Sequence, residues 1–275
     1  MKHPLQVNIR RKIFPGADSV VVEDLMLTAS PGEFVAIVGP SGAGKSTLLN
    51  IVAGLDREMD GDVQMDGRPL HADGLITARI GFVFQEPRLM PWLTVIDNLM
   101  LVLDRSADSV ERVRQLLREV GLADKEQSFP GQLSGGMQRR VSLARAFAMR
   151  PELLLMDEPF LSLDAPTAAR LRRLLLTLWG ELHPTVLFVT HHLREALALA
   201  DRLLFLSSSP GRVVLEVPVQ LPRPRELGDA SIGELHDRLL AQYPDLLSGL
   251  AEEKQSASDI PDSDNRQSIM SDEVH

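Results

Sequence analysis

The chain carries the stretch Gly39-Pro40-Ser41-Gly42-Ala43-Gly44-Lys45-Ser46, which matches the pattern G-x-x-x-x-G-K-[ST] and is followed by Thr47. Residues 33–38 before it predict a buried apolar strand, and residues 45–53 predict a helix that leaves the turn. A loop of small residues lets successive backbone N–H groups surround phosphate oxygens, and the helix N-terminus adds its positive dipole end. The stretch therefore predicts a phosphate-binding loop, residues 39–47, in an α/β domain.

Two side chains of this loop have separate predicted roles. The ammonium group of Lys45 would place a positive charge on the β- and γ-phosphates of a nucleotide. The hydroxyl of Ser46 is an oxygen ligand of the kind that Mg²⁺ prefers. The alternative is a chance match in a glycine-rich loop, with a probability on the order of 1% in a chain this long. The predicted strand and helix on either side favour the nucleotide site.

A second motif consists of the apolar run 153–156 followed by Asp157 and Glu158. A strand buried on both faces ends at the carboxyl edge of a parallel sheet, where ligands bind. Asp157 is therefore predicted to hold Mg²⁺, and Glu158 to orient or deprotonate an attacking water molecule. The alternative, a plain strand followed by a polar turn, would carry about half the weight if this motif stood alone.

The rest of the chain alternates strands and helices, which indicates an α/β fold. Strands are expected at residues 5–14, 20–28, 62–65, 81–84, 153–156, 186–189, 203–206 and 213–219. The helical pattern runs from about 88 to 150, and further helices are expected at 165–182, 193–200 and 231–250.

Composition and charge exclude several classes of protein. The chain has 275 residues and no cysteine, which removes thiolate chemistry, disulfides and cysteine-based zinc sites. More than half of the net charge of −9 comes from residues 252–275, so the body is near neutral and has no basic stripe for nucleic acid. No run reaches the roughly 18–20 apolar residues of a membrane helix, and residues 1–12 lack the apolar region of a signal peptide. We therefore expect any membrane role to depend on a partner.

The stretch Leu133-Ser134-Gly135-Gly136-Met137-Gln138 precedes a predicted helix and resembles the signature of ABC ATPases, whose fifth residue is usually Gln. A Ser-Gly-Gly run at a helix start is a second anion site. In isolation, a simple helix cap would be the better interpretation. Four further pieces fall in the order of that family: Gln85 resembles its Q-loop, Ser162-Leu163-Asp164 its D-loop, Thr190-His191 its switch-histidine loop, and Phe14 its adenine-stacking aromatic residue.

The resemblance implies a role for each of these positions. The catalytic residues would be Glu158, His191, Lys45 and Gln85. ATP would contact Phe14, the loop 39–47, Ser134, Gly135, Gly136 and Asp164. Mg²⁺ would be held by Ser46, Gln85 and Asp157. Phe14 could instead be a core residue, and His192, which stands where the family often has Asp, is expected to have no catalytic role.

The resemblance also implies an architecture. It predicts a P-loop NTPase (RecA-like) core with an antiparallel β subdomain and an inserted α-helical subdomain. The ATPase domain would span residues 5–228, with the helical subdomain at about 88–150. A helical extension at 229–254 and a disordered acidic tail at 255–275 would follow.

Narrower motifs suggest a subgroup. The stretch 84–92, with Ser209-Pro210-Gly211-Arg212 and 221–225, resembles importers of nitrate, sulfonate, taurine and bicarbonate, although importers of thiamine precursors share much of it. The implied partners are a transmembrane permease, a periplasmic or extracellular solute-binding protein and a second copy of the chain in an ATP-sandwich homodimer, at the cytoplasmic face of the cell membrane. Leu89, Met90, Trp92 and Leu93 would dock the permease or be subdomain core.

Two other classes stay open. A soluble ABC-type ATPase acting on ribosomes or DNA usually has two cassettes or a coiled-coil insertion, and the sequence shows neither. A kinase or GTPase with the same phosphate loop would leave Gln85, Ser134 and His191 without a joint explanation.

Overall fold

The computed structural model describes residues 4–72 and 74–249. The predicted tail at 255–275 and the end of the predicted extension at 229–254 lie outside the described residues. Within the described part, no helix combines the length and the apolar character needed to cross a membrane.

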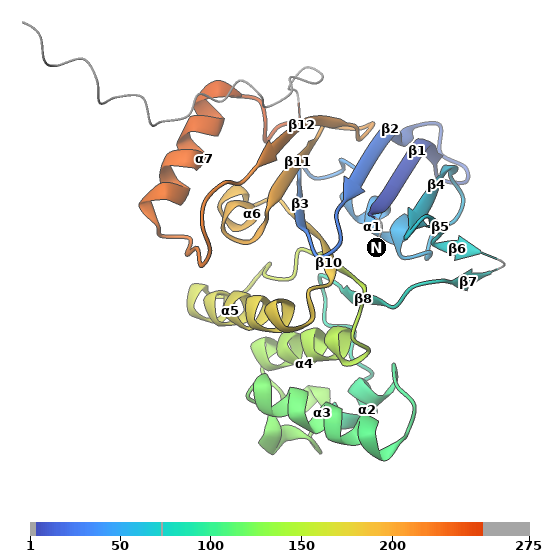
Figure 1. Cartoon of the computed structure of the whole chain (residues 1–275), viewed down its shortest axis with the longest axis vertical. Coiled ribbons are helices and arrows are strands. Elements are labelled where there is room, and N and C mark those ends of the chain that lie inside the picture. The colour runs from blue at the N-terminus through green and yellow to red at the C-terminus, as the bar shows by residue number, and fades with distance from the viewer. Residues whose placement is uncertain (1–3, 73, 250–275) are drawn as a thin grey trace, which may run out of the picture.

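A six-stranded sheet forms the centre of the molecule, in the order β12-β11-β3-β10-β9-β8 (Figure 1). Its strands are β3 (Phe34–Val38), β8 (Ile80–Val83), β9 (Leu153–Asp157), β10 (Thr185–Thr190), β11 (Arg202–Leu206) and β12 (Val213–Pro218). The first five are parallel, and β12 pairs antiparallel with β11. Residues of β3 alternate between two cores, with Phe34 and Ala36 in one and Val35 and Ile37 in the other. Burial on both faces explains the uninterrupted apolar sequences.

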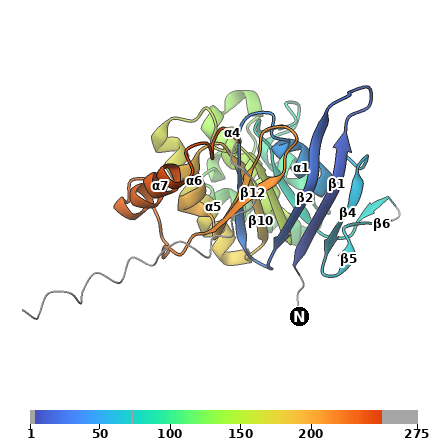
Figure 2. The same ribbon diagram turned by 90° about the horizontal axis from the view of Figure 1, so that it is seen from above.

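A second sheet is antiparallel and has the order β2-β1-β4-β5. It consists of β1 (Leu5–Ile13), β2 (Val20–Ala29), β4 (Asp60–Met65) and β5 (Arg68–Pro69). A tight turn joins β4 to β5, in which Asp66 and Gly67 both have positive φ, 54° and 71°. Figure 2 shows this sheet as a layer of its own beside α1 (Lys45–Val52). A small hairpin, β6 (His71–Ala72) and β7 (Leu75–Ile76), extends from it and was not expected from the sequence.

The helices form two groups (Figure 1). A cluster below the central sheet contains α2 (Val95–Met100), α3 (Ala107–Glu119) and α4 (Gly135–Ala148), which pack on one another. The others are α5 (Ala165–Leu182), α6 (Leu193–Leu199) and α7 (Ala230–Gln242). Short 3-10 turns at Ala123–Lys125 and Pro130–Gln132 join α3 to α4. Among the described residues, the predicted RecA-like core, antiparallel subdomain and inserted helical subdomain are all present.

Two predicted helical boundaries are wrong. Helix begins at Val95 rather than near residue 88, because Pro87 and Pro91 interrupt it and Arg88 has a φ of 46°. The expected helix at 231–250 ends at Gln242, shortly before Pro244, and residues 245–249 form turns. The helix that does form, α7, buries Ile232, Leu235 and Leu239 in the main core and packs on α6.

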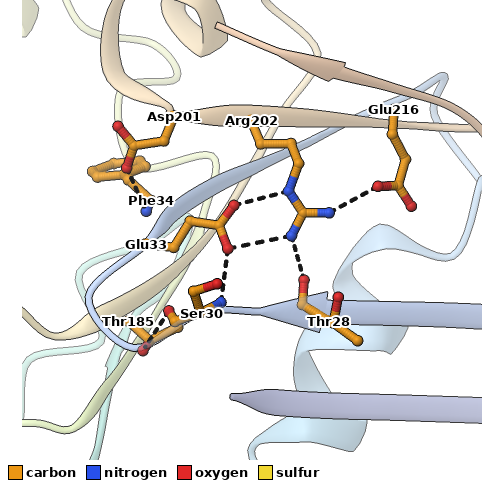
Figure 3. A network of polar contacts seen from close by, with 8 residues as sticks. All are labelled: Thr28, Ser30, Glu33, Phe34, Thr185, Asp201, Arg202 and Glu216. Atoms are coloured by element: carbon orange, nitrogen blue, oxygen red, sulfur yellow. Dashed lines mark hydrogen bonds and ion pairs between the residues drawn. The ribbon is translucent and has the colours of Figure 1, made fainter. Parts of the chain in front are cut away.

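Arg202 is the first residue of β11 and contacts both sheets (Figure 3). Its guanidinium contacts both carboxylate oxygens of Glu33, at 2.8 and 3.3 Å, and donates to Glu216 at 2.8 Å. It also donates to the backbone oxygen of Thr28 at the end of β2. Burial alone would lower the pKa of Arg202, but the carboxylates of Glu33 and Glu216 outweigh this and raise it. One planar cation therefore ties β2, β3, β11 and β12 together.

Candidate functional site

The loop between β3 and α1 has the backbone that a phosphate cradle requires. Gly42 and Gly44 have φ values of 83° and 79°, which side chains rarely adopt. A Cβ atom on Gly44 would lie 2.8 Å from the Cγ2 atom of Val22. Glycine at position 44 is therefore needed for both backbone conformation and space, and it lets α1 begin directly at Lys45. The loop and the start of α1 are therefore adjacent in the structure, and their binding of phosphate stays a prediction.

Lys45 is folded over this loop and is only 7% exposed. Its Nζ atom donates hydrogen bonds to the backbone oxygens of Gly39 at 2.8 Å and Pro40 at 2.7 Å. Burial lowers the pKa of Lys45, while the carboxylates of Glu158 and Asp157 oppose the shift. The ammonium group thus lies inside the loop, between a predicted phosphate position and two acids.

Asp157 ends β9 and faces the start of α1. The hydroxyl of Ser46 lies close enough to the carboxylate of Asp157 to act against the rise of its pKa. Burial raises the pKa of Asp157, the charge of Glu158 adds to the rise, and Ser46 and Lys45 act against it. The structure therefore brings together two of the three predicted Mg²⁺ ligands as adjacent oxygen donors. No contact in the described residues adds the side chain of Gln85 to this pair.

Glu158 and His191 form a direct pair. Glu158 has a φ of 43°, and its backbone N–H donates to the Val189 oxygen at 3.0 Å across to β10. Its Oε2 atom lies 3.0 Å from Nδ1 of His191. A positive φ at a non-glycine residue costs on the order of 1–3 kcal/mol, which is typical of functional sites. The sequence indicated both residues but gave no sign that they touch.

His192 lies beside this pair without reaching Glu158. Its ring centroid is 4.0 Å from that of His191, and its backbone N–H donates to the hydroxyl of Thr190. That hydroxyl in turn donates to Glu195, which pairs with Arg172 of α5 at 3.3 Å. Sequence reasoning missed Glu195 and Arg172, because neither belongs to a recognised motif. Their ion pair joins the switch loop to the helix that follows Asp164.

The signature residues form the start of α4. Ser134 is the N-cap, and its hydroxyl accepts a hydrogen bond from the backbone N–H of Met137 at 3.3 Å. A Cβ on Gly135 would touch nothing, whereas one on Gly136 would lie 2.8 Å from Cγ2 of Thr167. A cavity of about 320 Å³ lies beside this helix start, between α3, α4 and α5. In the described part of the chain, no hydrogen bond joins residues 134–136 to the phosphate loop.

Gln85 and Asp164 lie on exposed loops at either side of this site. The backbone oxygen of Gln85 accepts a hydrogen bond from Arg139 of α4 at 2.8 Å. Asp164 caps α5 by accepting from the backbone N–H of Thr167 at 3.1 Å, and this contact lowers the pKa of Asp164. The predicted roles of Gln85 on Mg²⁺ and Asp164 at ATP stay predictions.

Phe14 lies just beyond β1, and its side chain is 42% exposed. The ammonium group of Lys12 lies 4.8 Å above the ring and also pairs with Asp56 at 2.6 Å. This exposure contradicts the alternative of a core residue and leaves a ring face for stacking a base.

The four apolar residues considered for permease docking separate into two kinds. Leu89, Met90 and Leu93 are half-buried, and Leu89 packs against the core. Trp92 is 71% exposed. Among the four, Trp92 is therefore the residue with free surface for a partner.

Comparison with known proteins identifies the family. The sequence pattern of the ABC transporter family matches residues 22–161. The chain is 44% identical over 239 residues to an aliphatic sulfonates import ATP-binding protein of Burkholderia cenocepacia strain HI2424, covering 87% of each. It is 40% identical over 240 residues to a protein of the same name from Bacillus subtilis strain 168, covering 86% of this chain and 93% of the relative.

Solved structures agree with these sequence relatives. A dimeric bacterial ABC transporter cassette matches with a TM-score of 0.68 and 31% identity, over 79% of this chain and all of the other. A post-hydrolysis dimer of the same cassette, bound to ADP and phosphate, matches with a TM-score of 0.65 and 30% identity over the same shares. By its match to the family pattern and to these relatives, the chain belongs to the ATP-binding, ATP-hydrolysing subunits of the ABC transporter family.

Proposed function

We propose that this chain is the motor subunit of an ABC importer, in which ATP binding closes a pair of subunits and hydrolysis reopens it. The observation that carries the proposal is the meeting of Lys45, Asp157, Glu158 and His191 at the carboxyl edge of the central sheet. The names of the relatives as import ATP-binding proteins support the direction of transport.

The chemistry follows from the charges at this edge. When phosphates enter the loop, Lys45 exchanges its carbonyl partners for phosphate oxygens and places its charge there. Glu158 then orients or deprotonates the attacking water, and His191, already 3.0 Å from Glu158, positions that carboxylate and contacts the transferring phosphoryl group. Charge that develops on the phosphoryl oxygens is stabilised by groups already in position.

Mg²⁺ fits the residues that face the loop. The hydroxyl of Ser46 and the buried carboxylate of Asp157 are adjacent hard oxygen donors. Burial raises the pKa of Asp157, and the charge of a divalent ion beside it would offset that effect. When bound, Mg²⁺ would neutralise charge between the β- and γ-phosphates. Ser46 and Asp157 are the residues that we assign to it, with Gln85 as the third predicted ligand.

A second copy would complete each ATP site. Ser134, Gly135 and Gly136 are exposed or half-buried at a helix N-terminus, and among the described residues no hydrogen bond joins them to the phosphate loop of their own chain. In a head-to-tail dimer they would cover the γ-phosphate held by Lys45 of the other copy. Loss of that phosphate would remove the contact that favours the closed pair, so hydrolysis would reopen it.

The remaining partners follow from the importer assignment. The exposed indole of Trp92 would contact a transmembrane permease and hold the chain at the cytoplasmic face of the membrane. A separate solute-binding protein would deliver the solute. The names of the relatives favour an aliphatic sulfonate, within the nitrate, sulfonate and taurine group that the sequence motifs suggested.

The decisive experiment is a mild-detergent pull-down of the tagged chain from its native membranes with Mg-ATP, read by mass spectrometry. We expect one multi-span permease as the main partner, and the complex rebuilt in liposomes should take up an aliphatic sulfonate in preference to nitrate. Recovery of ribosomal or DNA-repair proteins alone would overturn the transport role and leave the ATPase chemistry. Uptake of nitrate instead would mean that nitrate, and not an aliphatic sulfonate, is the solute.

A further inference from the structure

The side chain of Arg139 connects three segments of the chain that are distant in sequence. Its Nη1 atom donates to the backbone oxygens of Gln85 at 2.8 Å and Pro159 at 2.9 Å. Its Nη2 atom donates to the backbone oxygen of Leu161 at 2.7 Å. All three contacts go to carbonyl groups, so they fix the paths of two loops. No motif in the sequence marks Arg139 as special.

Each of the connected segments carries a predicted ATP-site residue. One contact reaches Gln85 itself. The other two grip the loop between Glu158, which precedes Pro159, and Asp164, which caps α5. Arg139 also belongs to α4, the helix that begins after the signature residue Ser134. We call the loop from Glu158 to Asp164 the acid loop. One guanidinium therefore connects the signature helix, the Q-loop and the acid loop.

The loop from Glu158 to Asp164 is held at its start by the Glu158 N–H bond to Val189 and by the buried ring of Phe160. Its internal backbone bonds are short-range, from Leu161 to Glu158 at 3.1 Å and from Leu163 to Phe160 at 3.3 Å. Glu158 and Ser162 both have positive φ values, 43° and 62°. Backbone held in such conformations persists only where the surroundings determine it. The two hydrogen bonds from Arg139 supply an anchor at the centre of this loop.

The environment of Arg139 suits a rigid connector better than a solvent-exposed charge. Burial lowers the pKa of the guanidinium. The group lies beside the apolar residues Phe160 and Leu143, which are almost fully buried. A planar guanidinium has five donors in a fixed fork, so it can hold several carbonyl groups at set angles, which a lysine ammonium cannot do.

We propose that Arg139 is a positioning residue that holds Gln85 and Glu158 in register with the signature helix of the same chain. It touches no reacting atom and acts through the backbone of the two loops. When the signature helix moves during closure, Arg139 would move both loops with it. This inference rests on the proposed ATPase motor function and adds the residue that links its parts.

A neighbour on the same helix provides a matched control. Arg145 is also partly buried, and it donates to the backbone oxygens of Pro87 at 3.0 Å and Arg88 at 2.9 Å. Its bonds reach the segment after Gln85, whereas the loop from Glu158 to Asp164 is held by Arg139. Both arginines thus anchor α4 to carbonyl groups, and they differ in their contact with the acid loop.

The test compares Arg139→Met, Arg139→Lys and Arg145→Met in the full chain. For Arg139→Met we expect kcat for ATP hydrolysis to fall about 10- to 100-fold, because misplacement of a catalytic group by about 1 Å can cost 100-fold. The KM and the affinity for a fluorescent ATP analogue should change less than about 3-fold, since Lys45 and its loop are not contacted. Arg139→Lys should lie between wild type and Arg139→Met. Arg145→Met should lower Tm to a similar degree but kcat by less than about 5-fold.

Two results would overturn the proposal. One is an Arg139→Met protein with wild-type kcat, and the other is an equal loss of kcat in the Arg139 and Arg145 variants, which would reduce both to general anchors of α4. If Arg139→Met does not fold, Arg139→Lys decides alone: a folded protein with wild-type kcat would contradict the proposal. A wild-type chain that hydrolyses no ATP, alone or with its permease, would instead mean that the proposed function has failed.

Discussion

At the scale of single residues, Glu158 is constrained from two sides. Its backbone is held to β10 through the Val189 oxygen, and its carboxylate lies 3.0 Å from His191. A carboxylate fixed in this way can orient a water molecule without first reorganising. Lys45 and the loop amides are the groups that we propose to bind phosphate, and the hydrogen bonds of Lys45 go to Gly39 and Pro40 rather than to Glu158. Binding and hydrolysis should therefore be separable at Glu158.

We predict that Glu158→Gln lowers the rate of ATP hydrolysis by about 100-fold or more while ATP still binds. The amide preserves the shape of the side chain but cannot accept a proton from water. Single-turnover hydrolysis and equilibrium binding of labelled ATP measure the two effects. The bound state should accumulate as a dimer in gel filtration. Turnover close to wild type would move the predicted base to another group.

Asp157, which is predicted to hold Mg²⁺, is a buried carboxylate whose charge lowers the stability of the folded chain. Its pKa is raised above the ordinary value of 3.8, so the folded protein binds this proton more tightly than the unfolded chain does. Its contribution therefore favours folding below pH 3.8 and is lost as the pH rises through the raised native pKa. At neutral pH the buried charge disfavours the nucleotide-free fold.

We predict that Asp157→Asn raises the free energy of unfolding of the nucleotide-free protein at pH 7.5 by on the order of 1 kcal/mol and abolishes Mg²⁺-dependent hydrolysis. The gain should be smaller at pH 5 than at pH 7.5, because burial raises the pKa of Asp157 and so lets it take up a proton more readily as the pH falls. Urea unfolding at the two pH values measures it. Asp104→Asn is the control, because the pKa of Asp104 is lowered by hydrogen bonds from Ser109 and Ser106. An equal gain in the free energy of unfolding in the Asp157 and Asp104 variants would show that burial of Asp157 is not its cause.

At the scale of elements, Arg202 is one of the contacts that hold the two sheets together (Figure 3). We predict that Arg202→Met lowers the free energy of unfolding by about 2–4 kcal/mol, because Glu33 would keep a partly buried charge without its cation. Urea unfolding measures this. Arg10→Met is the control, since the Arg10–Asp60 pair is exposed and such pairs contribute about 0–1 kcal/mol. Equal losses of unfolding free energy in the Arg202 and Arg10 variants would show that burial of the Arg202–Glu33 pair adds nothing to stability.

The elements also show what sequence patterns can and cannot predict. Strands β3, β9 and β10 are uninterrupted apolar runs because both faces are buried, so their positions could be predicted closely. The structure of segment 88–94 could not be predicted in this way. Its apolar residues suggested a helix, which Pro87, Pro91 and the positive φ of Arg88 prevent.

The same limit applies to the site. Lys45, Asp157, Glu158 and His191 were each indicated by a local motif, and the fold brings them to one edge. The contacts of Arg139, Arg172 and Glu195 had no such signal, because they join segments distant in sequence. A pattern reports spacing along the chain, whereas these side chains matter through tertiary contacts to backbone and to one another.

At the scale of the whole molecule, a single chain holds the two parts of the ATP site in separate places. The phosphate loop precedes α1 beside the antiparallel sheet, and the signature begins α4 in the helical cluster (Figure 1). The related cassettes are dimers in their solved structures. A head-to-tail pair would place Lys45 of each copy against the signature of the other.

This arrangement predicts that two inactive variants restore activity when they are mixed. Lys45→Ala removes the phosphate contact, and Gly135→Glu places a negative charge where the γ-phosphate of the partner site would lie. The glutamate should leave its own chain folded, because a Cβ on Gly135 meets no atom within 4 Å and an acid suits a helix N-terminus.

In a mixed dimer, one site receives both defects and the other receives the intact Lys45 and the intact signature. Random pairing of equal amounts should therefore restore about a quarter of wild-type ATPase activity, since half of the dimers carry one sound site of two. Steady-state ATP hydrolysis of the separate and mixed proteins measures this. The control is the Lys45→Ala, Gly135→Glu double variant mixed with Lys45→Ala, which cannot recover activity because no chain in it has Lys45. If the mixed single variants stay as inactive as each alone, the signature does not act on the partner's nucleotide, and the assignment of Ser134, Gly135 and Gly136 to a shared site is wrong.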